Sequence, residues 1–258
     1  MKEYNGYLID LDGTMYRGSE PIDGAATFID ALNKKRIPYL FLTNNSTSTQ
    51  EAVAQKLRDM GIDTTSDHVF TSSLATAKYI KQQNAQARCM VIGEHGLYDA
   101  IEREGLTIVD SSCDYVVIGL DRQINYEKLT RACLAIRDGA KFISTNGDIA
   151  IPTERGLLPG NGALTSVITV STGVEPTFIG KPEQIIMKEA LKVLGTVKKD
   201  TIMVGDNYQT DIRAGINAEV DTLMVFTGVT PYEAYPHLEI KPTYYVQNLR
   251  EWGWGIKG

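Results

Sequence analysis

The stretch from Tyr7 to Thr14 constrains the fold of this chain more than any other part of its sequence. Three bulky residues open the stretch, and a polar turn with two aspartates and a glycine follows directly. A short apolar run that stops abruptly in such a turn is typical of a buried parallel strand. Ligands of open α/β sheets bind at the carboxyl ends of the strands, where Asp10 and Asp12 are expected.

The spacing of these two aspartates indicates a cation. On a regular strand Asp10 and Asp12 share one face, and two negative charges that close repel each other unless a cation lies between them. Mg²⁺ takes oxygen ligands and keeps several waters, so it suits such a pair and leaves room for a phosphate. A plain polar turn remains an alternative for the motif alone. An EF-hand calcium loop does not fit, because Met15 and Pro21 occupy the positions of its glycine and its bidentate glutamate.

The composition narrows the class of protein. A chain of 258 residues is long enough for one large core or two modest ones. The formal charge of −6 argues against a nucleic-acid polymer as partner, because that binding needs clustered lysine and arginine. The sequence has neither a membrane-spanning apolar stretch nor a signal peptide, so we expect a cytoplasmic protein that makes no membrane contact. Its three cysteines form no CxxC pair, which argues against disulfides and structural zinc.

Apolar runs and helical patterns alternate along the chain, which predicts parallel βαβ units. In the first part we expect strands over 7–9, 39–42 and 69–70, with one helix capped by Asp23 and others ending near Met60 and Gln83. From about Ala87 a second set of α/β elements begins, with no second DxD motif. The first pattern resumes at Gly180. The predicted architecture is therefore a Rossmann-like parallel-sheet core over 1–80 and 180–258, with an inserted α/β domain over 81–179.

Polar side chains follow three of the predicted core strands, and a lysine precedes a helix that packs on the same sheet. These residues are Asp10 and Asp12, Thr43 and Asn44, Asp206 and Asp211, and Lys181. Carboxylates, a hydroxyl, an amide and a lysine are the groups needed around a phosphate and a metal ion. Each residue alone has an ordinary structural interpretation, as a cap, a turn or a solvated side chain. Their common position at strand ends favours catalysis.

The chemistry assigns a role to each group. Asp10 is the expected nucleophile, and it forms an aspartyl-phosphate intermediate. Asp12 protonates the leaving oxygen and later activates water. Thr43 hydrogen-bonds the transferring phosphoryl group, and Lys181 neutralises it.

Mg²⁺ is the expected cofactor, and three aspartates are expected to hold it. The predicted metal ligands are Asp10, Asp206 and the backbone carbonyl of Asp12. Asp211 and its neighbour Asn207 are expected to support this site without binding the metal directly.

The sequence resembles the haloacid dehalogenase (HAD) superfamily of phosphatases, and within it the NagD-type branch that includes the p-nitrophenyl phosphatases. The matching pieces are Asp10 to Thr14, Thr43 to Ser46, Gly180 to Pro182, Gly205 to Asp211 and Thr227 to Thr230. The resemblance covers nearly the whole chain. It implies a HAD core with a large α/β cap and the residue roles given above. It also implies a Mg²⁺-dependent phosphatase that hydrolyses phosphoric monoesters, and it is compatible with a homodimer.

The expected substrate is a small phosphorylated metabolite, since a large cap favours small esters. Candidate substrate-binding residues are Asn44 and Asn45 in the core, and Asn146 and Asp148 in the cap. Branch members that hydrolyse pyridoxal phosphate carry a histidine shortly after Asp148. This chain has Ile149-Ala150-Ile151-Pro152 there, which makes that substrate less favoured. Sugar phosphates and nucleoside monophosphates remain as unranked alternatives.

Three other functions compete with hydrolysis. One is phosphoryl transfer to an acceptor other than water, and another is non-catalytic binding of a phosphorylated ligand on the same fold. The third is a nicotinamide dehydrogenase, which the sequence disfavours because the Gly160-Asn161-Gly162 stretch lacks a third glycine and follows Pro159 rather than a buried strand. This stretch predicts the start of a helix.

Overall fold

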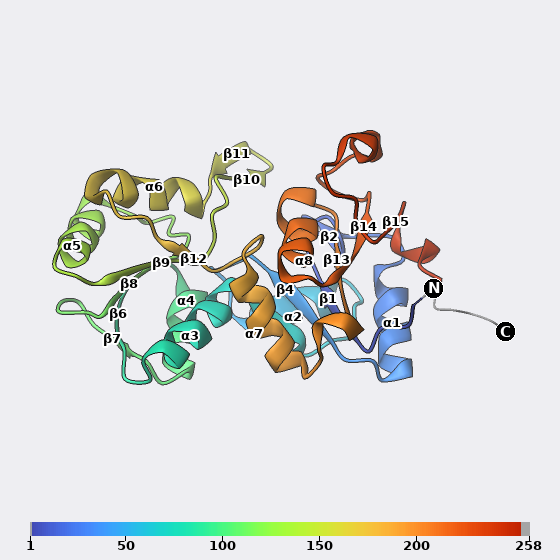
Figure 1. The fold of residues 1–258 in the computed structure, drawn as a ribbon, viewed down its shortest axis with the longest axis horizontal. Coiled ribbons are helices and arrows are strands. Elements are labelled where there is room, and N and C mark those ends of the chain that lie inside the picture. The colour runs from blue at the N-terminus through green and yellow to red at the C-terminus, as the bar shows by residue number, and fades with distance from the viewer. Residues whose placement is uncertain (1, 254–258) are drawn as a thin grey trace. The chain divides into compact units, whose positions relative to one another are not determined.

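The computed structural model describes residues 2–253, and its chain divides into two compact units. Unit 1 comprises residues 1–43, 50–70 and 181–258, and unit 2 comprises residues 44–49 and 71–180. Figure 1 shows that each unit contains a sheet with helices around it. Among the described residues, no helix combines the length and apolar character that crossing a membrane requires.

Unit 1 is built on a six-stranded sheet with the order β15-β14-β13-β1-β4-β5. The strands are β1 (Gly6–Ile9), β4 (Tyr39–Thr43), β5 (Val69–Thr71), β13 (Thr201–Gly205), β14 (Asp221–Val225) and β15 (Tyr244–Val246). The pairings from β15 to β4 are all parallel. The chain runs outward from β1 to β4 and β5, then returns to β13 on the other side of β1. The sheet therefore reverses its direction of growth between β1 and β13, where open α/β sheets bind ligands.

Helices cover both faces of this sheet. They are α1 (Ala25–Lys35), α2 (Gln50–Asp59), α7 (Gln184–Leu194) and α8 (Arg213–Ala218). The apolar sides of α1 and α2 share one buried cluster with alternate residues of β1, β4, β13 and β14, including Ile9, Phe41 and Val204. The shorter elements are the hairpin β2 (Tyr16–Arg17) and β3 (Glu20–Pro21), a π-helical turn over Tyr208–Ile212, and 3₁₀ turns over Ser66–His68, Lys198–Asp200, Tyr232–His237 and Leu249–Glu251.

The start of α1 differs from the prediction. Asp23 was expected to be its N-cap, but the N-cap is Gly24, with a positive φ of 89° and no side-chain cap. The side chain of Asp23 pairs instead with Arg250. The left-handed conformation at Gly24 places Asp23 one residue too early to reach the first free amides of the helix.

Unit 2 is built on a five-stranded sheet with the order β12-β9-β8-β6-β7. Its strands are β6 (Arg88–Ile92), β7 (Thr107–Ile108), β8 (Tyr115–Ile118), β9 (Lys141–Ser144) and β12 (Thr177–Phe178), and their pairings are all parallel. Its helices are α3 (Ser72–Gln83), α4 (His95–Arg103), α5 (Tyr126–Arg137) and α6 (Asn161–Thr172). One apolar cluster joins α5 and α6 to the sheet. The α/β fold class is confirmed in both units.

The segment after Asp148 is more regular than its Pro and Gly content indicates. It forms an antiparallel hairpin of β10 (Ala150–Thr153) and β11 (Gly156–Pro159), with Gly156 at a φ of 109° in the turn. Helix α6 then begins at Asn161 with Gly160 as its N-cap, as the predicted helix start requires. The hairpin is a free two-stranded ribbon, where proline costs little because no third strand needs its missing N–H.

The division of the chain differs from the predicted domain boundaries, by a single residue at Gly180, which belongs to unit 2, and by more at two other places. Unit 2 begins at Thr71 instead of residue 81, and it also includes the short segment 44–49. The hydroxyl of Ser72 donates to the carbonyl oxygen of Asn44 at 2.8 Å, and that of Ser73 donates to Ser46 at 3.0 Å. These hydrogen bonds tie α3 and the 44–49 segment together, and they leave no local signature in the sequence.

Candidate active site

The predicted catalytic residues of unit 1 lie at the carboxyl edge of its sheet. Asp10 follows the last residue of β1, and Asp206 follows the last residue of β13. These two strands are neighbours, with Ile9 opposite Val204, so the aspartates emerge side by side where the sheet changes direction. Thr43 ends β4 on the other side of β1. Sequence positions far apart are therefore brought to one edge by the parallel topology.

Lys181 is the buried cation of this site. Its Nζ lies 2.5 Å from Oδ1 of Asp10 and 2.7 Å from Oδ1 of Asp211, and its side chain is only 3% exposed. Burying an ammonium group is costly unless it is paired and hydrogen-bonded, and two carboxylates provide that pairing. Although burial lowers the pKa of Lys181, Asp10 and Asp211 raise it above its usual range. The amine therefore stays charged.

Asp206 is held by groups on both sides. Its Oδ1 accepts a hydrogen bond from Oγ1 of Thr14 at 3.1 Å, and its Oδ2 accepts one from the backbone N–H of Val229 at 2.6 Å. The hydroxyl of Thr14 also lies 3.4 Å from Oδ2 of Asp10, so it bridges the two carboxylates. Gly228 leaves the space that this arrangement needs, because a Cβ there would lie 1.9 Å from Oδ2 of Asp206.

Asp211 supports the lysine from behind. It lies in the π-helical turn over 208–212, and its Oδ2 accepts a hydrogen bond from the backbone N–H of Asn207 at 3.0 Å. The side-chain oxygen of Asn207 caps the same turn by accepting from the N–H of Gln209. Wide π turns are frequent at functional sites, and this one aims Asp211 at Lys181. Both oxygens of Asp211 are thus engaged, which agrees with a supporting position.

Asp12 differs from the other aspartates because it is exposed. Partial desolvation nevertheless raises its pKa, while Lys56 and the N–H of Gly18 act in the opposite direction. Its backbone joins the turn before β2, where Gly13 N–H donates to the carbonyl oxygen of Tyr16 at 2.8 Å. An accessible carboxyl group with a raised pKa is suited to giving and taking protons.

The buried carboxylates carry more negative charge than the site balances. Burial and the charge of Asp211 raise the pKa of Asp10 well above its ordinary value, although Lys181 opposes the shift. Burial and Asp211 likewise raise the pKa of Asp206 to about 6. Carboxylates that lie close together in a buried site become protonated more easily, unless a further cation binds beside them.

A divalent metal ion fits this donor set. Asp10, Asp206 and Asp211 each offer a carboxylate oxygen, and these three oxygens lie within 4.8 Å of one another. The single ammonium group of Lys181, which pairs with Asp10 and Asp211, cannot balance three carboxylates. Hard oxygen donors of this kind suit Mg²⁺ or Ca²⁺ better than zinc or copper. Asp10, Asp206 and Asp211 are therefore the side chains whose oxygens could hold such an ion.

The predicted substrate-binding residues form a second cluster, which belongs to unit 2. Nδ2 of Asn44 lies 3.2 Å from both carboxylate oxygens of Asp148, and Nδ2 of Asn146 donates to the backbone carbonyl of Asn44 at 2.9 Å. The side-chain oxygen of Asn45 accepts from the backbone N–H groups of Thr47 and Ser48, so it shapes the loop. The structure thus brings three of the four residues together. Their role toward a substrate stays a prediction.

Two contributors to the site received no role from the sequence. Thr14 lies within the first motif, and the stretch from Thr227 to Thr230 lies within the family resemblance, but neither was assigned a function. The hydroxyl of Thr14 and the backbone N–H of Val229 hold Asp206. A threonine directly after a catalytic turn is a signal that could have been used. A backbone N–H carries no side-chain signature.

Comparison with known proteins decides the family. Residues 7–107 match the sequence profile described as haloacid dehalogenase-like hydrolase, and residues 178–252 match one described as HAD-hydrolase-like. The 5'-nucleotidase YutF of Bacillus subtilis is 60% identical, over 98% of this chain and 98% of its own. An acid sugar phosphatase of Staphylococcus epidermidis is 58% identical, over 96% of each chain. The chain belongs to the haloacid dehalogenase-like hydrolases. The family resemblance is therefore confirmed.

Solved structures of this family share the fold. A double mutant of the thermostable NPPase from Geobacillus stearothermophilus superimposes with a TM-score of 0.93 at 57% identity, covering 98% of this chain and 99% of that one. A glycerol phosphate phosphatase from Mycobacterium tuberculosis, solved in complex with calcium, gives a TM-score of 0.89 at 36% identity. That match covers 96% of this chain and 74% of the other. The Rossmann-like core of a HAD phosphatase is confirmed in this chain.

Proposed function

We propose that this protein is a Mg²⁺-dependent phosphatase of small phosphomonoesters that works through a phosphorylated Asp10. The observation that carries the proposal is the convergence of buried Asp10, Asp206, Asp211 and Lys181 at the carboxyl edge of β1 and β13. A buried lysine between carboxylates is costly for folding, and the cost is understandable where a phosphate must be bound and transferred. The relatives are named as phosphatases and a nucleotidase, and these names agree with hydrolysis of phosphomonoesters.

In the first half of the reaction, a carboxylate oxygen of Asp10 attacks the phosphorus of the ester. A new P–O bond forms to Asp10, and the bond between phosphorus and the ester oxygen breaks. Asp12 gives its proton to the departing oxygen, and its raised pKa makes it a competent acid. Lys181 and the hydroxyl of Thr43 stabilise the charge on the transferring group.

In the second half, water hydrolyses the aspartyl-phosphate. Asp12, now ionised, takes a proton from the water, whose oxygen attacks phosphorus as the bond to Asp10 breaks. Inorganic phosphate leaves and Asp10 returns to its carboxylate form. Asp211 and Asn207 act at a distance by holding Lys181 through the contacts described above. In this scheme one carboxylate serves as nucleophile and the other as acid and base.

Mg²⁺ is the proposed cofactor, with Asp10, Asp206 and the backbone carbonyl of Asp12 as its protein ligands. When bound, the ion supplies Lewis-acid stabilisation of the negative charge on the phosphoryl oxygens. The calcium complex of the mycobacterial relative shows that a divalent cation binds that protein. The hard oxygen donors of this chain favour the same class of ion.

The proposed substrate class is a sugar phosphate or a nucleoside monophosphate. The relatives carry names of both kinds, 5'-nucleotidase and acid sugar phosphatase, and they are nearly equally similar to this chain. We propose that unit 2 acts as the substrate-selecting cap, with Asn44, Asn45, Asn146 and Asp148 as candidate contacts. The protein is expected to act in the cytoplasm on small molecules.

Phosphate release from a panel of monoesters tests the reaction. The panel contains p-nitrophenyl phosphate, sugar phosphates, nucleoside monophosphates and pyridoxal phosphate, each with Mg²⁺ and with excess chelator. We expect release that depends on Mg²⁺ and is strongest for one chemical group. Release that is unchanged by the chelator would contradict the metal requirement. Product formation that rises with the concentration of an added alcohol acceptor would favour a phosphotransferase.

Asp10→Asn tests the nucleophile directly. The amide keeps the shape of the side chain but cannot attack phosphorus, so activity should fall by at least about a thousandfold. Circular dichroism should show an intact fold, and Asp63→Asn, at an exposed aspartate of the same unit, should keep full activity. Unchanged hydrolysis by the Asp10 variant would exclude the aspartyl-phosphate route. Binding of substrate without turnover by the wild type would favour the sensor alternative.

A further inference from the structure

A cavity in unit 2 lies apart from the residues discussed so far. Its volume is about 220 Å³, and it is lined by α3, β8, β9, β12 and the residue Glu175. Its lining includes the first residue of β8 and the first three residues of β9, whereas the candidate catalytic residues follow the carboxyl ends of strands in unit 1. Ligand pockets for drug-sized molecules span roughly 300–1,000 Å³, so this cavity suits only a small molecule.

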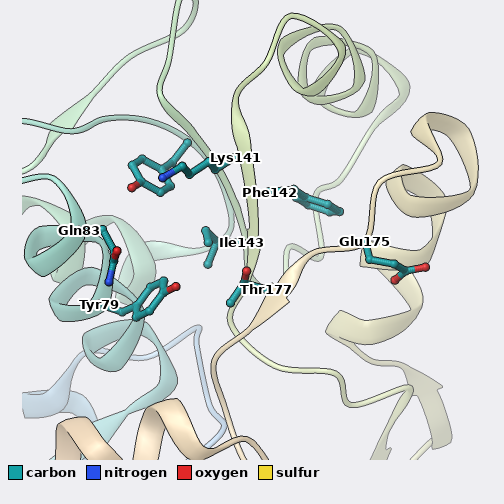
Figure 2. A pocket seen from close by; sticks show the side chains of 8 residues that line it. Tyr79, Gln83, Lys141, Phe142, Ile143, Glu175 and Thr177 are labelled. Atoms are coloured by element: carbon teal, nitrogen blue, oxygen red, sulfur yellow. The ribbon is translucent and has the colours of Figure 1, made fainter.

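The cavity combines apolar walls with polar groups. Ile143 and Tyr115 are buried in the sheet and form part of the wall, and Tyr79 comes from α3. Figure 2 shows the side chains of Tyr79, Gln83, Lys141 and Thr177 around one hollow. Flat apolar walls with a few convergent polar groups are the usual composition of a small-molecule site.

The polar groups of this hollow are free of hydrogen bonds and ion pairs within the described part of the chain. No hydrogen bond involves the side chains of Tyr79, Gln83 or Thr177 there, and Lys141 forms no ion pair. Nζ of Lys141 lies 5.5 Å from the centre of the Tyr115 ring, a cation–π distance that keeps the amine beside the hollow. Four side chains able to donate hydrogen bonds therefore face one small space.

The charged side chains of the lining indicate the sign and the magnitude of the charge that a ligand would carry. Lys141 is the only cation in the lining, and Gln83, Tyr79 and Thr177 are neutral groups that adapt to an acceptor. Glu175 also belongs to the lining, but Figure 2 shows it directed to the other side of the strand, away from Lys141. A single ammonium group suits one negative charge better than the two of a phosphate ester.

We propose that this cavity is a binding site for a small planar monocarboxylate, separate from the candidate phosphoryl-transfer residues of unit 1. The carboxylate group pairs with Lys141 and accepts hydrogen bonds from Gln83 and Thr177. The flat body of the ligand packs against Ile143 and the tyrosine rings. Charge-assisted hydrogen bonds are the stronger kind, so Lys141 contributes most of the affinity.

Titration of the full chain with benzoate, followed by calorimetry and ligand-observed NMR, tests the proposal. Benzoate carries one carboxylate on a flat ring and no phosphate. We expect saturable binding, and Lys141→Gln should weaken it by at least about tenfold. Tyr79→Ala should weaken it as well by removing a wall. Lys141 is exposed, so the glutamine variant should fold normally, as its melting temperature will show.

Matched controls show whether benzoate binding requires this cavity and its charge. Arg155→Gln removes one positive charge from an exposed position of the same unit and should leave benzoate affinity unchanged. Benzylamine, which has the same ring and the opposite charge, should not bind. Inorganic phosphate should not displace benzoate. No binding of benzoate, equal affinity in the Lys141 variant, binding of benzylamine, or displacement by phosphate would each overturn the proposal.

Discussion

The residue that shapes the carboxylate edge of unit 1 most tightly is a glycine. Gly228 precedes Val229, whose N–H binds Asp206, and a Cβ at Gly228 would also lie 2.7 Å from Cα of Gly13. Backbone on one side and a buried carboxylate on the other leave a methyl group no way to relax. Asp206 is 0% exposed and cannot swing out into solvent. The position therefore admits only glycine if Asp206 is to keep its place.

Gly228→Ala should consequently weaken Mg²⁺-dependent hydrolysis by displacing Asp206. Activity should fall by about tenfold or more at limiting Mg²⁺, and excess Mg²⁺ should restore part of it, since the loss lies in the position of a ligand. Gly253→Ala is the matched control, because a Cβ there meets nothing within 4 Å. Activity assays over a range of Mg²⁺ concentrations measure the effect. Equal behaviour of the two variants would contradict the steric argument.

A second residue links stability to pH. Asp221 accepts hydrogen bonds from Nζ of Lys2 at 2.8 Å and the hydroxyl of Tyr4 at 2.7 Å. Burial opposes ionisation, but these partners lower its pKa below the ordinary value. A carboxyl group whose pKa is lower in the folded state stabilises the fold above its unfolded pKa, and this stabilisation disappears as the pH falls through the folded pKa.

Asp221→Asn should therefore reduce stability at neutral pH and make the acid side of the stability curve shallower. The difference between wild type and variant should be full above about pH 5 and should shrink as the pH falls below the unfolded pKa near 3.9. Urea unfolding at several pH values measures it. Asp63→Asn, at an exposed position, provides a comparison for a general change in net charge. A difference that is constant with pH would show that Asp221 does not titrate as argued.

At the scale of elements, the sequence predicted what depends on regular patterns. Buried strands such as Gly6–Ile9 and Thr201–Gly205 are strongly apolar runs that stop at polar turns, so their carboxyl ends and the aspartates after them were predictable. The hairpin over 150–159 was not, because Pro152 and Pro159 mask its pattern. The cap of α1 depends on the φ of Gly24, and the support of Asp206 depends on a backbone N–H. Neither a backbone dihedral angle nor the position of a backbone N–H can be read from the identities of the side chains.

The short segment 44–49 is an element whose role could not be predicted from its own sequence. It follows Thr43 directly, yet it is anchored within unit 2 by Ser72, which donates to the carbonyl of Asn44, and by Ser73, which donates to that of Ser46. Both hydroxyls are buried. Removing that of Ser73 costs about 1–3 kcal/mol because the carbonyl of Ser46 loses its donor. The carbonyl of Asn44 keeps its hydrogen bond from Nδ2 of Asn146 when the Ser72 hydroxyl is removed. Only the first anchor lies next to Thr43.

Ser72→Ala should lower kcat, by roughly threefold to tenfold, with little change in KM, because the backbone beside Thr43 loses one of the two hydrogen bonds that hold the Asn44 carbonyl. Ser73→Ala should lower the melting temperature at least as much as Ser72→Ala does, and it should leave kcat near that of the wild type. The comparison separates positioning from general destabilisation. If both variants lose activity in proportion to their stability, the anchor has no specific effect on Thr43.

At the scale of the whole molecule, the two units have separate apolar cores. The cluster that contains Ile29 joins α1 and α2 to the sheet of unit 1, and the cluster that contains Ile168 joins α5 and α6 to the sheet of unit 2. The two clusters share no residue. Each of these two clusters packs within its own unit, so we expect local opening of one cluster to leave the other packed.

Core truncations should consequently act on one unit at a time. Ile168 is 0% exposed, and its replacement by alanine should cost about 2–5 kcal/mol through lost contacts and a cavity. Amide hydrogen exchange should accelerate by at least about thirtyfold in β6, β8 and β9 and much less in β1, β4 and β13. Ile29→Ala, at an equally buried position of unit 1, should give the reverse pattern. Equal acceleration in both sheets for either variant would mean that the chain opens as one cooperative body, and that the separate cores do not divide its stability.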